Sequence, residues 1–113
     1  GPAALLVAKV HKIVDREEHP GRLKDKDALD VFRLLRGTPT ADMARRLSVV
    51  LADSRSADSA RVAMAAFPAL FAQASGRGVQ MALRATAGLM AEAEVTASLI
   101  ALAKDLSAEL GHA

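Results

Sequence analysis

The stretch RLKDKDALDVFRLLR, residues 22–36, is densely charged yet places apolar residues at the i, i+3, i+4 and i+7 positions of one helical face. These apolar residues are Ala28, Val31, Phe32 and Leu35. Gly37 follows, and glycine commonly ends helices because it adopts the left-handed conformation without strain. The pattern therefore predicts a helix that begins between Lys24 and Lys26 and ends at Gly37.

Two aspartates lie on one flank of this predicted helix. Asp27 sits at the edge of the apolar stripe, and Asp30 lies about 60° from it around the helix axis, with Lys26 beyond them. The carboxylates can pair with cations of a neighbouring helix or belong to a ligand site, and ion pairing is the commoner role. Two carboxylates are too few for a hard-cation site, so no metal site is predicted.

The preceding residues predict another helix over Ala3–Arg16, ended by the breaker-rich residues 17–21. One side of it is apolar and carries Leu6, Val10, Ile13 and Val14. Another side carries three cations within about 40°, here called the basic ridge: Lys9, Lys12 and Arg16. Like charges so close repel one another, so the ridge favours an anionic neighbour, either the aspartate flank or the phosphates of a ligand.

Further helices follow along the chain. Residues 38–42 predict a helix start with Pro39 in the first turn, Arg45 and Arg46 are expected to face solvent, and this third helix ends near residue 53. The Ser/Asp cluster at residues 54–59 predicts the cap of a fourth helix, which Pro68 must kink or split. That helix runs through Val62, Ala66 and Leu70.

The last third of the chain predicts two more helices. Gly76-Arg77-Gly78 precedes a fifth helix marked by Val79, Leu83, Thr86 and Met90. After a boundary at Gly88, a final helix ends at Gly111 and carries Val95, Leu99, Leu102, Leu106 and Leu110. The fold class expected is all-α: a compact bundle of five to six helices with short loops and mostly antiparallel neighbours.

Length and composition fit one helical domain. The chain has 113 residues, is 51% hydrophobic and only 3% aromatic, and lacks cysteine, which excludes disulfides and thiolate metal sites. It shows neither a signal peptide nor a long apolar run, so a soluble, cytoplasmic protein is expected. Gly1-Pro2 has the form of a tag-cleavage scar. Residues 3–113 are therefore expected to be the carboxy-terminal domain of a longer protein.

Catalytic groups are not evident in the sequence. The three histidines, His11, His19 and His112, lack metal-ligand spacing and have no partner nucleophile. Gly76-x-Gly78 is too short for a phosphate loop and follows no strand. No catalytic residue is predicted in this chain.

Two of these segments resemble a known family. Leu5-x-x-x-Lys9 on one helix, followed by Lys26-Asp27-x-x-Asp30 at the start of the next, resembles the third and fourth motifs of the AbiEii/AbiGii-type nucleotidyltransferases. These are the toxin halves of abortive-infection systems and their relatives. The family's fourth motif begins with arginine, where this register has Lys24. The resemblance covers residues 5 to about 36.

The resemblance implies a helical carboxy-terminal domain that lines a nucleotide and acceptor cleft. The nucleotide-binding residues expected here are Lys9, Lys12, Lys26, Asp27 and Asp30. Nucleoside triphosphate and Mg²⁺ would be needed by the full-length enzyme. The catalytic carboxylates belong to an amino-terminal nucleotidyltransferase domain, so this chain is expected to be inactive alone and to have that domain as its partner.

Two alternatives come from the helical pattern alone. Alanine-rich faces allow close helix approach, which favours a non-catalytic interaction module or a homodimer. A helix-turn-helix within residues 41–62 is the weaker alternative, because the helices are too long and the turn lacks its usual glycine. DNA is therefore not an expected partner.

Overall fold

The computed structural model describes residues 1–16 and 24–111 and folds them into six helices. The helices are α1 Pro2–Arg16, α2 Asp25–Gly37, α3 Thr40–Ala52, α4 Ala57–Phe71, α5 Arg77–Thr86 and α6 Glu92–Gly111. The radius of gyration of 13.2 Å is the value expected for a compact domain of this size. The six helices confirm the predicted all-α fold of five to six helices. The described residues contain no strand.

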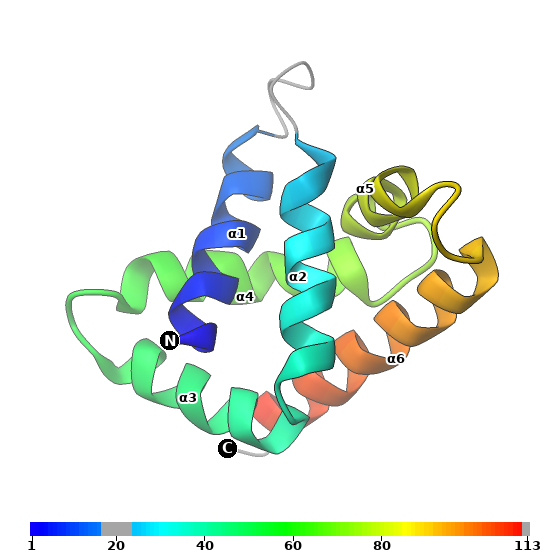
Figure 1. Cartoon of the computed structure of the whole chain (residues 1–113). Helices are drawn as coiled ribbons and strands as arrows, with labels where there is room; N and C mark the ends of the chain where they lie inside the picture. Colours follow the sequence, from blue (N-terminus) through cyan, green and yellow to red (C-terminus); the bar gives the residue numbers. More distant parts are fainter. Residues whose placement is uncertain (17–23, 112–113) are drawn as a thin grey trace.

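Helices α1 and α2 stand side by side and run in opposite directions (Figure 1). Helix α4 crosses behind α1 and contacts it, α3 packs against α1 and α6, and α5 lies beside α2. The predicted antiparallel arrangement therefore holds for α1 and α2, whereas α4 crosses α1 instead of running alongside it. Helix α1 contacts the three helices that follow it, α2, α3 and α4.

The core is aliphatic apart from three phenylalanines. Phe32, Phe67 and Phe71 are fully buried, and the rings of Phe67 and Phe71 lie 5.5 Å apart in a tilted pair. All four residues of the predicted α2 stripe are buried, as are three of the four predicted for α1. The helical periodicity thus identified the buried faces of both helices correctly.

Gly37 differs from its predicted conformation, whereas Gly88 lies at a helix boundary as predicted. Helix α2 ends at Gly37 as predicted, but Gly37 keeps a negative φ because the backbone N–H of Thr38 still bonds to the carbonyl of Leu34 at 3.1 Å. The left-handed glycine is Gly88, with φ of +79°, in the connection from α5 to α6. Gly88 lets the chain turn there at no steric cost.

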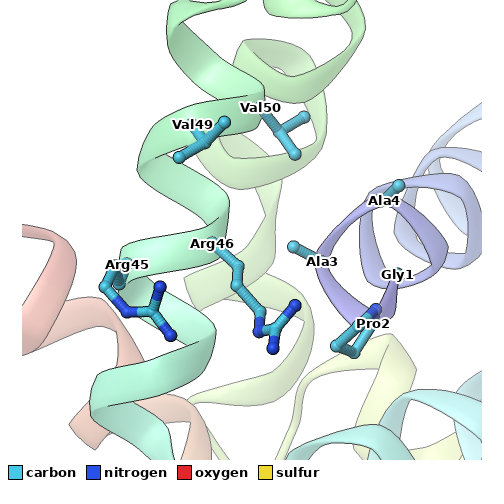
Figure 2. A pocket seen from close by; sticks show the side chains of 8 residues that line it. All are labelled: Gly1, Pro2, Ala3, Ala4, Arg45, Arg46, Val49 and Val50. Carbon is cyan, nitrogen blue, oxygen red and sulfur yellow. The ribbon is translucent and has the colours of Figure 1, made fainter.

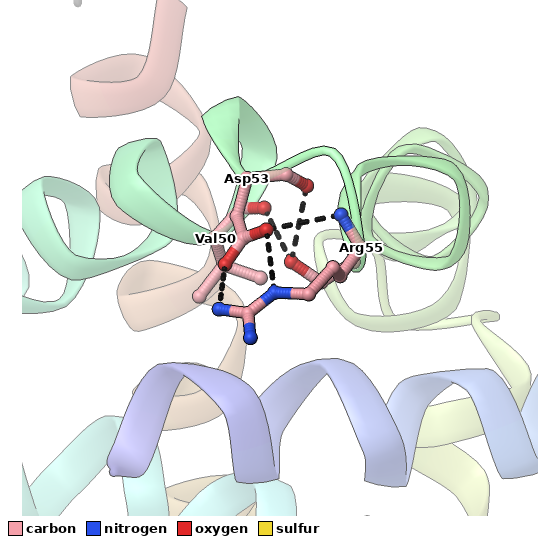
Figure 3. A network of polar contacts seen from close by, with 4 residues as sticks. Val50, Asp53 and Arg55 are labelled. Atoms are coloured by element: carbon pink, nitrogen blue, oxygen red, sulfur yellow. Dashed lines mark hydrogen bonds and ion pairs between the residues drawn. The ribbon is translucent and has the colours of Figure 1, made fainter.

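The starts of α3 and α4 differ from the prediction in their capping. Pro39 precedes α3 instead of occupying its first turn, and Ser56 makes no side-chain cap to α4. The Ser56 hydroxyl donates instead to the carbonyl of Val50 at 2.8 Å and so satisfies the end of α3. The Asp53 carboxylate accepts hydrogen bonds from the backbone N–H and the guanidinium of Arg55 (Figure 3).

Helices α4 and α5 also correct the sequence predictions. Helix α4 continues past Pro68 to Phe71, so Pro68 does not split it. Val62 faces solvent, and the buried side of α4 is formed by other residues: Ala57, Ala60, Ala63, Phe67, Leu70 and Phe71. Helix α5 already contains Gly78 in its first turn and ends at Thr86, before Met90.

Candidate functional site

Lys9 of α1 lies between the two aspartates of α2. Its Nζ is 2.9 Å from Oδ2 of Asp30 and 3.5 Å from Oδ1 of Asp27. Lys9 belongs to the basic ridge, and Asp27 and Asp30 form the aspartate flank. The predicted ion pairing between the ridge and the flank is therefore confirmed. The antiparallel packing of α1 against α2 brings these groups together.

Two further cations complete what we call the α1–α2 ion-pair cluster: Lys9, Arg16, Asp27, Asp30 and Arg33. Arg16 reaches Oδ2 of Asp27 at 3.5 Å, and Arg33 approaches Oδ1 of Asp30 at 3.8 Å. Three cations thus surround two carboxylates, which leaves the cluster with a net positive charge. An anion near its open side would be attracted.

Burial strengthens the central part of this cluster. The Asp27 side chain is 8% exposed and that of Lys9 is 19% exposed, so water screens their charges less than at the surface. The hydrogen bond to Asp30 and the charges of Asp30 and Asp27 outweigh the effect of burial and raise the pKa of Lys9 above its ordinary value of 10.5. Lys9 is therefore a positioned, permanently charged ammonium group at neutral pH.

The cluster opens onto a surface hollow of about 500 Å³. Lys9, Asp30 and Arg33 form its polar part, and Leu5 and Leu34 form its apolar part. Its remaining wall is the end of α2, at residues 37–38. The mixture of cations with half-exposed leucines suits a ligand that has both an anionic and an apolar portion.

A second hollow of about 440 Å³ adjoins the first and shares Arg33 with it. It is lined by Arg33, Arg36 and Gly37. The guanidinium of Arg36 lies over the ring of Phe32, 5.1 Å from its centroid, in a cation–π contact that holds Arg36 in place. Both arginines of α2 therefore lie at one edge of the site.

Two of the predicted nucleotide-binding residues lie apart from this centre. Lys12 and Lys26 are exposed, line neither hollow and form no ion pair with another described residue. Arg22, His19 and His112 lie outside the described residues. His11 contacts Asp15 one turn further along α1, at 3.1 Å, rather than the cluster.

The residues in this site do not fit a divalent metal ion. In the described part of the chain, no three histidine or acidic side chains come close enough to share a metal. Asp27 and Asp30 are each already paired with two cations. A Mg²⁺ ion would need more oxygen ligands than this arrangement offers.

A separate hollow of about 320 Å³ lies between the start of α1 and α3 (Figure 2). It contains Arg45 and Arg46, which face solvent as predicted, beside Val49 and Val50. Both guanidinium groups bond to the carboxylate of Asp42. The bond from Arg46, followed by that from Arg45, lowers the pKa of Asp42 below 3.8.

Sequence reasoning missed two residues of the site, Arg33 and Arg36. Their spacing held a usable signal, because Arg33 lies three residues after Asp30 and Arg36 lies four residues after Phe32. Residues at these separations touch on a helix surface. Their charges also favour the C-terminal end of the helix, whose dipole is negative there.

No helix within residues 1–16 and 24–111 combines the length and apolar character needed to cross a membrane. Comparison with known proteins gives no further assignment. No protein-family model, no curated protein sequence and no solved structure matches this chain.

Proposed function

We propose that this chain is the helical carboxy-terminal domain of a nucleotidyltransferase-like protein and forms one wall of its nucleotide and acceptor cleft. The observation that supports this most directly is the position of Lys9 between Asp27 and Asp30. These three residues come from both motifs that resemble the AbiEii/AbiGii-type enzymes. Helix packing gathers them beside a hollow large enough for part of a nucleotide.

In this proposal the aspartates orient the lysine rather than bind metal. Asp30 and Asp27 hold the ammonium of Lys9 at the edge of the hollow, where it can contact the triphosphate as a point charge. A group positioned in advance loses less entropy when it binds its ligand. The amino-terminal nucleotidyltransferase domain would supply the catalytic carboxylates and the Mg²⁺ site, so the present chain would not be active alone.

The test uses the full-length protein, supplied with nucleoside triphosphate and Mg²⁺, and measures transfer of the nucleotide. The informative variant is Lys9→Met combined with Asp30→Leu. Replacing an ion pair by apolar residues commonly preserves stability, and Asp27 keeps Arg16 as its partner in this variant. Transfer should fall by about a hundredfold, the usual effect of losing a group that contacts a reacting phosphate.

Lys104→Met provides the matched control, because Lys104 is an exposed lysine of α6. It should retain wild-type transfer. The unfolding temperatures of both variants show whether the fold survives. A well-folded Lys9→Met/Asp30→Leu protein that transfers nucleotide at the wild-type rate would refute the proposed role of the cluster.

A second candidate function, self-association, is favoured by the outer face of α4. Val62, Ala65, Pro68 and Ala69 are exposed there, and residues 62–76 contain no charged residue. A two-fold dimer brings the same patch of both subunits together, so an uncharged patch is compatible with a copy of itself. Small alanine side chains also allow two helices to approach closely.

Light scattering over a range of concentrations tests this candidate. The wild-type chain should form dimers as its concentration rises, and Ala65→Glu should remain monomeric because two like charges would meet at the interface. A wild-type chain that stays monomeric at millimolar concentration would exclude self-association through α4.

A further inference from the structure

Two arginines on the exposed side of α2 each contact another residue of that helix without being fully neutralised. Arg33 is 66% exposed, and its ion pair with Oδ1 of Asp30 is long, at 3.8 Å. The other oxygen of Asp30 is closer to Lys9, at 2.9 Å. Arg36 rests on the buried ring of Phe32 and forms no ion pair with the described residues. Both guanidinium groups therefore keep donors that can bind an anion.

These arginines connect the two hollows. Arg33 lines both of them, while Lys9 lies in the first and Arg36 in the second. Three cations thus follow a continuous surface from α1 across α2. A linear chain of phosphates carries several negative charges along its length and so can contact several cations at once.

We propose that Arg33 and Arg36, together with Lys9, bind the triphosphate chain of a nucleotide on this surface. The inference rests on the proposed function and deepens it, because it moves phosphate binding from Lys12 and Lys26 to the arginines of α2. Guanidinium groups suit this task, since each can donate two parallel hydrogen bonds to one phosphate. The leucines of the first hollow would then lie near the nucleoside.

One feature of α2 opposes an anion here, namely the partial negative charge at its C-terminal end. Gly37 and Thr38, which line the first hollow, belong to this end. The two arginines in the second half of α2 counter that partial charge with full positive charges. Binding should therefore depend on the arginines strongly and weaken as salt is added.

The experiment titrates the isotope-labelled 113-residue chain with inorganic tripolyphosphate in the absence of metal, at low salt. Amide NMR signals of Gly37 and Thr38 report on the hollow. Arg33→Gln and Arg36→Gln should each weaken binding about tenfold, the effect of losing one charge-assisted contact. A nucleoside triphosphate should perturb the same amides, and a nucleoside without phosphates should not.

Arg61→Gln is the matched control. Arg61 is 64% exposed and pairs with Asp58 three residues before it, the same relationship as that of Arg33 and Asp30. It should bind tripolyphosphate as the wild type does. Unfolding temperatures measured for every variant separate lost binding from lost folding.

The possible results divide clearly. Absent binding, equal binding by the Arg33→Gln and Arg61→Gln variants, or binding of RNA oligonucleotides but not of tripolyphosphate would overturn this inference. Tripolyphosphate binding that requires Arg33 would support it even if the full-length protein transfers no nucleotide, and only the proposed function would then fail. Transfer that requires Lys9 but neither arginine would leave the function standing and remove the inference.

Discussion

The ring of Phe71 lies so close to the backbone of Gly78 that a Cβ atom on Gly78 would be 2.4 Å from Cε1 of the ring. Gly78 lies in the first turn of α5 and Phe71 ends α4, so this contact fixes how the two helices meet. Gly78→Ala should lower the free energy of unfolding by about 1–3 kcal/mol, the usual effect of overpacking a core. Urea unfolding measures the difference.

Gly37→Ala is the control for this prediction. Gly37 ends α2 with a negative φ, and an added Cβ would meet no atom within 4 Å. It should leave stability unchanged or raise it by up to about 1 kcal/mol, because alanine restricts the unfolded chain. Combining Gly78→Ala with Phe71→Leu should recover part of the loss. If Gly78→Ala alone proves as stable as the wild type, the packing described here is wrong.

Lys9 should matter for stability as well as for the proposed function. Lys9→Met leaves Asp27, which is almost fully buried, with Arg16 as its partner at 3.5 Å, and leaves Asp30 with Arg33. We expect a loss of about 1–3 kcal/mol, below that of a fully buried pair because the cluster is partly exposed. Lys12→Met, on the same helix but exposed, should change stability by less than about 0.5 kcal/mol.

The contribution of Lys9 should also disappear in alkaline solution. The hydrogen bond to Asp30 raises the pKa of Lys9 above 10.5, so its stabilisation is fully present below that value and is lost as the pH rises through the raised pKa. The difference in stability between the wild type and Lys9→Met should therefore narrow in strongly alkaline solution. Denaturant unfolding at several alkaline pH values measures it, and a difference that stays constant would contradict the assigned ion pairs.

Asp53 should show the opposite dependence on pH. Hydrogen bonds from the side chain and then from the backbone of Arg55 lower its pKa below 3.8. The stabilisation is therefore present above that value and is lost as the pH falls through the lowered pKa. Asp53→Asn should be less stable than the wild type at neutral pH and equally stable in strong acid. Asp105→Asn, an exposed residue of α6, should match the wild type throughout.

The contact between α2 and α5 includes a bidentate ion pair. Arg84 bonds to both carboxylate oxygens of Asp25, at 3.0 to 3.3 Å, across 59 positions of sequence. Because Arg84 is 58% exposed, a double-mutant cycle of Arg84→Gln and Asp25→Asn should give a coupling energy of only about 0.2–1 kcal/mol. A coupling energy near zero would show that apolar packing alone joins α2 and α5.

The helices and the centre of the site could be predicted from the sequence because both depend on local periodicity. The stripe of α2 is buried as expected, and Asp27 and Asp30 face Lys9 because their angles around the two helix axes allow it. The helical periodicity of α1 does not show which member of the basic ridge reaches the aspartates. Arg16 reaches Asp27, whereas Lys12 points into solvent. This difference depends on core packing, which fixes the rotation and height of α1 against α2.

The remaining errors concern features that depend on contacts between helices. The sequence around Gly78 indicates a break between helices. In the structure Gly78 lies within α5, and its lack of a side chain leaves room for the ring of Phe71. Sequence spacing does not reveal this contact. Serine commonly caps the start of a helix, but the Ser56 hydroxyl donates to the carbonyl of Val50 at the end of α3 instead. The outward position of Val62 likewise follows from how α4 crosses α1.

The contacts of α1 with the three helices that follow it have a consequence for folding during synthesis. Helix α1 is synthesised before the helices that cover it, because its contacts are with α2, α3 and α4, the last of which ends at Phe71. Until that residue has emerged, the apolar side of α1 has no complete cover, and an isolated helix of 15 residues is only marginally stable in water. This part of the nascent chain should therefore stay unfolded, and accessible to chaperones, until α4 has been made.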